Sequence, residues 1–167
     1  MIVVCSLHEA PRQIEIHGAR HAIGILSPDS EHPQFETVTG EQHLRLSFHD
    51  IAAATPGLSA PGSQDMMKLL GFIRNWDATT PLLIHCWAGI SRSTAAGFIA
   101  TCLRNPNTAE AELAENLRAA SPSATPNPML VALADEAMGR EGRMISAIHR
   151  IGRGRNAYEG TPFILQS

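Results

Sequence analysis

The sequence predicts an α/β fold with a mostly parallel central sheet flanked by helices and a helical second half. Short apolar runs of strand length alternate with helical patterns in the first half of the chain, and helical patterns dominate the second half. With 167 residues the chain has the length of one domain. We therefore expect a single domain over residues 1–167, in which the tail from about residue 140 could be an appended helix.

Four segments have the pattern of strands. Two are compact apolar runs near the start of the chain, and one in mid-chain has no polar face, as expected of a central parallel strand. The fourth alternates apolar and polar residues, which is the period of a half-buried strand. In chain order these strands are residues 2–7, 22–26, 44–48 and 81–85, with loops expected over 28–43 and 55–62.

Helical patterns follow from residue 63 onward. Ser63 is the expected N-cap of the first helix, whose apolar stripe runs from Met66 to Trp76. Residues 95–103 are apolar nearly all round and predict a buried helix. Thr108 is expected to cap another helix with two glutamates in its first turn. Residues 129–138 predict a further helix, and the last thirty residues one short helix and a tail.

The composition excludes several classes of protein. A net charge of −3 argues against a nucleic-acid-binding protein, and no run reaches the length of a membrane span, so we expect no transmembrane segment. Three widely spaced cysteines, Cys5, Cys86 and Cys102, fit neither a disulfide framework nor a zinc ribbon. We expect a cytoplasmic protein in which Cys5 and Cys102 are core thiols, with an oxidative disulfide to Cys86 left open.

The segment between strand 81–85 and the buried helix has the features of an anion-binding loop. It leaves the carboxyl end of a central strand, where open α/β sheets bind their ligands. The helix that follows directs free N–H groups and the positive end of its dipole at the loop. Gly89 allows a tight turn, and the guanidinium of Arg92 can hold two phosphate oxygens. The expected substrate-binding residues are Trp87, Ala88, Gly89, Ile90, Ser91 and Arg92.

Cys86 lies inside this positive environment, which favours the nucleophilic thiolate over the thiol. A thiolate beneath a bound tetrahedral anion can attack phosphorus and form a phosphocysteine. The hydroxyl of Ser93 can stabilise the sulfur when it later leaves. The alternative is that Cys86 is an inert core thiol and Arg92 a surface charge.

The stretch from His85 to Ser93, HCWAGISRS, resembles the HC-x5-R-[ST] signature of the protein tyrosine phosphatase superfamily. Its AG-x-SRS pattern is most similar to the dual-specificity branch. The resemblance covers about residues 44–138 and implies a cysteine-phosphatase fold. The chain leaves little room for the recognition loop that deepens the pocket of longer tyrosine phosphatases, so the resemblance implies a compact type with a shallow site.

This chemistry needs a general acid to protonate the leaving oxygen, and Asp50 is the expected one. Asp50 follows strand 44–48, precedes a loop, and stands ahead of Cys86 by a spacing similar to that of the family. A plain turn residue is the alternative for Asp50, and Asp65 and Asp77 are weaker candidates for the acid.

Three further residues have expected supporting roles. His85 is expected to hydrogen-bond the backbone and order the loop. Asn127 is expected to cap a helix or tie down the loop. Trp87 could line the pocket rim or pack inward.

The sequence therefore predicts a cysteine-dependent phosphomonoester hydrolase, a tyrosine or dual-specificity protein phosphatase, that needs no cofactor or metal. Its expected partner is a phosphorylated protein or a small phosphomonoester. Two alternatives stay open: a phosphatase of inositol phosphates, nucleotides or phosphoinositides, and a module that binds phosphorylated partners without turnover. The arginines of the last thirty residues could form a solvated helix face, or a docking surface for an acidic substrate or a membrane.

Overall fold

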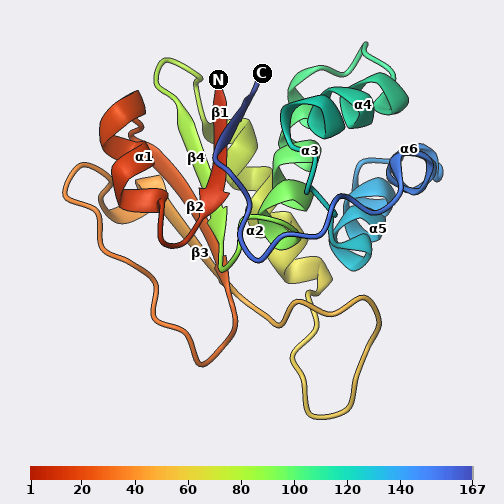
Figure 1. Cartoon of the computed structure of the whole chain (residues 1–167), viewed down its shortest axis with the longest axis horizontal. Helices are drawn as coiled ribbons and strands as arrows, with labels where there is room; N and C mark the ends of the chain where they lie inside the picture. The colour runs from red at the N-terminus through yellow and green to blue at the C-terminus, as the bar shows by residue number, and fades with distance from the viewer. Residues whose placement is uncertain (167) are drawn as a thin grey trace.

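A five-stranded sheet forms the centre of the molecule in the computed structural model, which describes residues 1–166 (Figure 1). Its strand order is β3-β2-β4-β1-β5. The first four strands of this order are mutually parallel, and only β5 runs antiparallel, along the outer edge of β1. The strands are β1 (Ile2–Ser6), β2 (His21–Leu26), β3 (His43–Ser47), β4 (Leu82–Cys86) and β5 (Phe163–Leu165).

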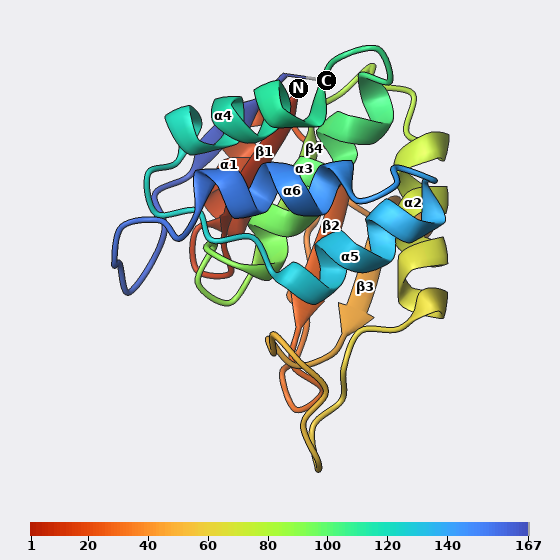
Figure 2. The same cartoon turned by 90° about the vertical axis from the view of Figure 1, so that its right-hand side faces the viewer.

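The four strands expected from the sequence are all present, with bounds shifted by at most one residue. β5 was not expected, because its three residues alternate buried and exposed over too short a length to give a pattern. It forms only because β1 offers a free edge, where Ile2 pairs with Leu165. This pairing places the two termini side by side, as both views show (Figures 1 and 2).

Six α-helices surround the sheet. They are α1 (Ala10–His17), α2 (Ser63–Asn75), α3 (Arg92–Arg104), α4 (Glu110–Ala120), α5 (Pro128–Ala137) and α6 (Arg143–Ile151), and a short 3-10 helix covers Gly40–Gln42. α1 packs on one face of the sheet against β1 and β4. α2 and α3 cover the other face, and α4, α5 and α6 form an outer layer on α3 (Figure 2).

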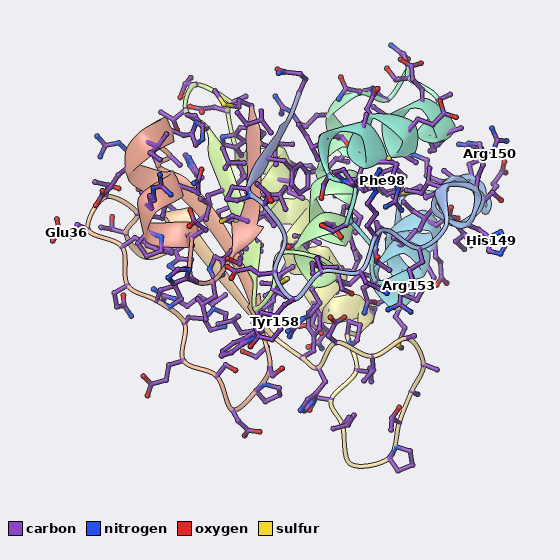
Figure 3. All side chains as sticks on the ribbon, in the orientation of Figure 1. Glu36, Phe98, His149, Arg150, Arg153 and Tyr158 are labelled. Carbon is purple, nitrogen blue, oxygen red and sulfur yellow. The ribbon has the colours of Figure 1, made fainter. Side chains whose placement is uncertain are left out.

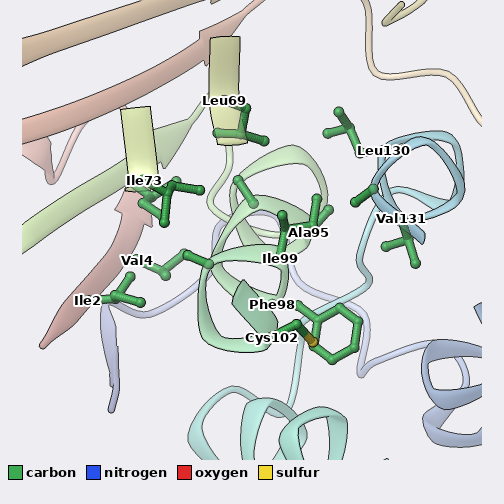
Figure 4. Close-up of a cluster of buried hydrophobic side chains, with 14 of the residues drawn as sticks. Ile2, Val4, Leu69, Ile73, Ala95, Phe98, Ile99, Cys102, Leu130 and Val131 are labelled. Atoms are coloured by element: carbon green, nitrogen blue, oxygen red, sulfur yellow. The ribbon is translucent and has the colours of Figure 1, made fainter. Parts of the chain in front are cut away.

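The main core lies between the sheet and the α2–α3 layer. Alternation along β1 directs Ile2 and Val4 into this core, while Val3 and Cys5 point to the α1 face. Phe98 and Ile99 of α3 are fully buried at its centre (Figure 4). Because α3 lies between the sheet and the outer helices, it is buried almost all round, as its apolar sequence predicts.

Two expected helix caps are wrong. Gly62, not Ser63, is the N-cap of α2, and its N–H donates to the carboxylate of Asp65 at 2.9 Å. Ala109, not Thr108, precedes α4, which has no side-chain cap. Instead, α4 begins with a buried acid, Glu110, which pairs with arginines from the outer layer. Long-range ion pairing of this kind has no local sequence pattern.

Helix α1 is the one α-helix that the sequence reading missed. This helix has only eight residues, so its apolar pattern is short. Its sequence signals are a proline in the first turn and Gly18 at the C-terminus, which has the left-handed conformation with φ 61°. Within residues 1–166, no helix is long and apolar enough to cross a membrane.

Candidate active site

The loop of residues 87–91 joins the end of β4 to the start of α3, at the edge of the sheet where the parallel strands end. Gly89 has φ 71°, a conformation that side chains with a Cβ rarely adopt. A Cβ on Gly89 would also lie 2.7 Å from the backbone nitrogen of Ser6. The loop therefore curls tightly against the end of β1, and glycine is required at its apex.

Four of the five carbonyl groups of this loop are bonded to residues outside it. The acceptors and donors are Trp87 O with Leu7 N (3.2 Å), Ala88 O with Gly160 N (2.8 Å), Ile90 O with Thr125 N (2.8 Å) and Ser91 O with Asn127 N (3.3 Å). Within the described chain, the amide N–H groups of residues 88–91 have no such partner. A loop with bonded carbonyls and free amides is an anion nest.

Cys86 ends β4 directly beneath this loop and is 2% exposed. Its Sγ lies 3.1 Å from the hydroxyl oxygen of Ser93, which is in the first turn of α3. α3 starts at Arg92, so its free N–H groups and positive dipole end lie at the same place. The geometry thus brings the Cys86 sulfur, the Ser93 hydroxyl and the N-terminus of α3 together beneath the loop.

The guanidinium of Arg92 is buried, with 4% of the residue exposed. Its Nη1 donates to the carbonyl of Phe48 at 2.8 Å and lies 3.4 Å from the hydroxyl of Ser27. Its Nε is buried and has no hydrogen-bond partner among the described residues. Because a buried N–H of a charged group is costly to leave unpaired, this orientation fits a site that receives an anion.

Asp50 lies beside the loop, although it is 41 residues from Ser91 in sequence. Its Oδ1 accepts hydrogen bonds from the hydroxyl of Ser91 at 2.7 Å and from Nδ2 of Asn127 at 2.8 Å. Its Oδ2 lies 4.0 Å from Nε of Arg92. The two donors thus hold one carboxylate oxygen and leave Oδ2 to face the pocket.

Asn127 combines both of the functions considered for it. Its Oδ1 accepts a hydrogen bond from the N–H of Leu130 at 3.1 Å, which caps α5. Its backbone N–H bonds Ser91, and its Nδ2 donates to Asp50 and to the carbonyl of Ile51. One side chain therefore connects the signature loop, the segment that carries Asp50, and α5.

Cys86, Arg92 and Asp50 line a hollow of about 510 Å³ that is open to solvent. Trp87 is 61% exposed and stands at the rim, so its inward alternative is wrong. Tyr158, which is 93% exposed and is labelled in Figure 3, also lines this hollow. The sequence analysis missed Tyr158, because the segment that carries it has no pattern linking it to a loop formed by residues 87–91.

His85 does not make the backbone hydrogen bond expected of it. Both ring nitrogens are buried and have no partner among residues 1–166. The ring packs against Phe35 at 6.1 Å between centroids and over Gly24, on the α1 face of the sheet. Burial, with smaller contributions from His43 and His32, lowers the pKa of His85 to about 3, so the ring is neutral at neutral pH.

The other two cysteines are buried and free, as is Cys86. Burial raises the pKa of Cys102 to about 12 and raises that of Cys5 as well, so neither is a ready nucleophile. In the described chain no cluster of three His, Cys, Asp or Glu side chains is arranged to hold a metal ion.

Solved structures share this arrangement of elements. Human DUSP28 matches with a TM-score of 0.63 at 20% identity, over 84% of this chain and 94% of that one. The structure of DUSP15 matches with a TM-score of 0.63 at 22% identity, over 90% of this chain and 92% of that one. The chain has the dual-specificity phosphatase fold.

The same fold includes PTPMT1, solved in complex with PI(5)P, which matches with a TM-score of 0.59 at 16% identity, over 91% of this chain and 95% of that one. No protein-family model and no curated protein sequence matches this chain. The dual-specificity phosphatase fold is therefore recognised here through the three-dimensional arrangement and the short loop motif.

Proposed function

We propose that this protein hydrolyses phosphomonoesters through a phosphocysteine intermediate, as a tyrosine or dual-specificity phosphatase. The observation that carries the proposal is the convergence of Cys86, the free amides of residues 88–91 and the guanidinium of Arg92, whose Nε has no hydrogen-bond partner, on one open hollow. Phosphoryl transfer needs little covalent chemistry beyond a positioned nucleophile and donors that hold the equatorial oxygens.

In the first step, the thiolate of Cys86 attacks phosphorus in line, and the bond between phosphorus and the ester oxygen breaks. The loop amides and Arg92 hold the three non-bridging oxygens. Asp50 delivers a proton from Oδ2 to the leaving oxygen. The products of this step are the free alcohol or phenol and a phosphocysteine.

In the second step, water attacks the phosphocysteine and the bond between phosphorus and sulfur breaks. The carboxylate of Asp50 accepts the proton of the water. The hydroxyl of Ser93, 3.1 Å from Sγ, stabilises the departing thiolate. Inorganic phosphate is released, and the enzyme regains its starting state.

This chemistry requires a reduced thiol, so we place the protein in a reducing compartment such as the cytoplasm. Its substrates would be phosphorylated proteins or small phosphomonoesters. A second candidate function is hydrolysis of a phosphorylated small molecule or lipid head group, which the likeness to the PTPMT1 complex with PI(5)P favours. Binding without turnover is disfavoured by the presence of Asp50 at the pocket.

The deciding experiment is hydrolysis of p-nitrophenyl phosphate by the wild type and Cys86→Ser, without added metal and with a chelator. We expect turnover by the wild type alone and no effect of the chelator. More than a few per cent of activity in Cys86→Ser would exclude the phosphocysteine route. No activity in either protein, with phosphate still bound, would indicate a binding module.

A further inference from the structure

A second hollow adjoins the catalytic one. Its volume is about 690 Å³, and it shares four of its lining residues with the catalytic hollow: Ile90, Ser91, Ala157 and Tyr158. Arg153 and Arg155 line the second hollow but not the catalytic one. The segment that bears them follows α6 and continues to Tyr158, and Figure 3 shows Arg153 beside the helices α5 and α6. A substrate bound at Cys86 could therefore extend directly into a basic site.

The side chains of these two arginines have no protein partner. Both residues are exposed, and neither makes an ion pair or a side-chain hydrogen bond with any residue from 1 to 166. Other arginines of this half of the chain are used structurally: Arg140 and Arg143 pair with Glu110, and Arg118 bonds three carbonyls. The positive charge of Arg153 and Arg155 is left for a ligand, in a chain whose net charge is −3.

The backbone that carries the arginines is fixed relative to the signature loop. The hydroxyl of Thr125 accepts a hydrogen bond from the N–H of Gly154 at 3.1 Å, while the N–H of Thr125 donates to Ile90 at 2.8 Å. The N–H of Arg155 donates to the carbonyl of Pro122 at 2.8 Å. Thr125 thus bonds both the segment between the arginines and the signature loop of residues 87–91. These two bonds set the spacing between the two hollows.

Gly154 shows how closely this segment is packed. A Cβ at this position would lie 2.5 Å from the backbone carbon of Ser123. Farther along, Gly160 bonds Ala88, and Glu159 accepts a hydrogen bond from the hydroxyl of Ser6. The segment is therefore anchored on both sides of Tyr158, so its arginines start from a defined backbone position.

We infer that Arg153 and Arg155 form a subsite for a second phosphate group on the substrate. This inference rests on the proposed function and narrows its substrate class to molecules that carry two neighbouring phosphates. Phosphate is favoured over a single carboxylate because two guanidinium groups can together balance a dianion and offer several paired donors. The second phosphate could belong to a peptide or to a small soluble ester.

The test compares matched pairs of substrates. One pair is a phosphotyrosine peptide with and without a neighbouring phosphoserine, and the other is a soluble inositol bisphosphate and its monophosphate. Each is tested as kcat/KM with the wild type, with Arg153→Gln/Arg155→Gln, and with Arg150→Gln as control. Arg150 lies on the outer side of α6, away from both hollows (Figure 3).

We expect the wild type to prefer the doubly phosphorylated member of one pair by about tenfold, since each exposed charge contact contributes a few-fold. The pair that shows the preference identifies the source of the second phosphate. The double variant should lose the preference, Arg150→Gln should keep it, and raising the salt concentration should weaken it. No preference in the wild type, or an undiminished one in the double variant, would overturn the subsite.

Hydrolysis of p-nitrophenyl phosphate separates this inference from the proposed function. If the wild type cleaves that ester but has no preference within either pair, the subsite is wrong and the phosphatase assignment stands. If the ester is not cleaved, the same pairs are compared by calorimetric binding to the wild type and the double variant. A preference for two phosphates that the double variant loses would then support the subsite in a binding protein, and equal affinities would refute it.

Discussion

Nδ2 of Asn127 donates a hydrogen bond of 2.8 Å to Oδ1 of Asp50, so the residue that caps α5 also positions the proposed general acid. The two residues are 77 positions apart in sequence. The hydroxyl of Ser91 holds the same oxygen, which leaves Oδ2 toward the pocket. The orientation of Asp50 is therefore set by the helix and the signature loop together.

Asp50→Ala tests the role of the acid. We expect kcat to fall by about 10²–10⁴ for esters with poor leaving groups, because a positioned acid contributes that much. The loss should be smaller for p-nitrophenyl phosphate, whose leaving group needs little protonation. Steady-state rates on a series of aryl phosphates give the dependence on leaving group. Equal losses across the series would show that Asp50 does not protonate the leaving oxygen.

Asn127→Ala tests the positioning of that acid. It should lower kcat on poor leaving groups more than on p-nitrophenyl phosphate, and leave KM nearly unchanged. Loss of the cap alone would cost about 1 kcal/mol of stability and would not depend on the leaving group. Asn127→Ser, which keeps a capping oxygen but lacks the amide donor to Asp50, is the matched control for stability. A loss in Asn127→Ala that is the same for every leaving group would mean that only folding is affected.

Ser93→Ala should slow the second step more than the first. A hydrogen bond to a charged group contributes about 1.5–3 kcal/mol, so we expect breakdown of the phosphocysteine to slow by about 10- to 100-fold. Rapid-quench kinetics should then show a burst of p-nitrophenol followed by a slow steady state. Absence of a burst, with the steady-state rate unchanged, would refute this role for the Ser93 hydroxyl.

Gly160→Ala should reduce activity although Gly160 is far from Cys86 in sequence. A Cβ at Gly160 would lie 2.7 Å from the carbonyl oxygen of Gly89, so the C-terminal segment and the signature loop would have to separate. Gly71 in α2 is the matched control, since a Cβ there meets nothing within 4 Å. We expect Gly71→Ala to keep full activity in the p-nitrophenyl phosphate assay. Equal activities of the two variants would show that the contact is dispensable.

Acid should destabilise the fold through His85. Its pKa of about 3 in the folded state lies below the ordinary value of about 6.5, so the unfolded chain binds a proton that the folded one does not. The free energy of unfolding should therefore fall as pH drops below about 6.5, by about 1.4 kcal/mol per pH unit from this group. Urea titrations at pH 7, 6 and 5 measure the slope.

His85→Gln should flatten this slope by that amount. Comparing slopes rather than absolute stabilities keeps the test valid if the variant is less stable. An unchanged slope in His85→Gln would assign the acid sensitivity to other groups. His43 is the next candidate, because burial lowers its pKa to about 4.

The sequence predicted the strands of the parallel sheet and the loop around Cys86 because both are encoded locally. Apolar runs mark buried strands, and the motif of residues 85–93 is contiguous. The contacts of Asp50 with Ser91 and Asn127 depend on strand order, which no local pattern encodes. Tyr158 and Arg153 reach the two hollows, and β5 reaches the edge of β1, only through contacts between distant parts of the chain, so the sequence analysis did not place them.

The pairing of β5 with β1 also bears on when the pocket is completed during synthesis of the chain. Cys86 and Arg92 leave the ribosome well before residues 153–165, which provide Tyr158, the bond from Gly160 to Ala88 and the last strand. Contacts between segments so distant in sequence form late and slowly. A nascent chain that already contains the whole signature loop thus still lacks one wall of the pocket.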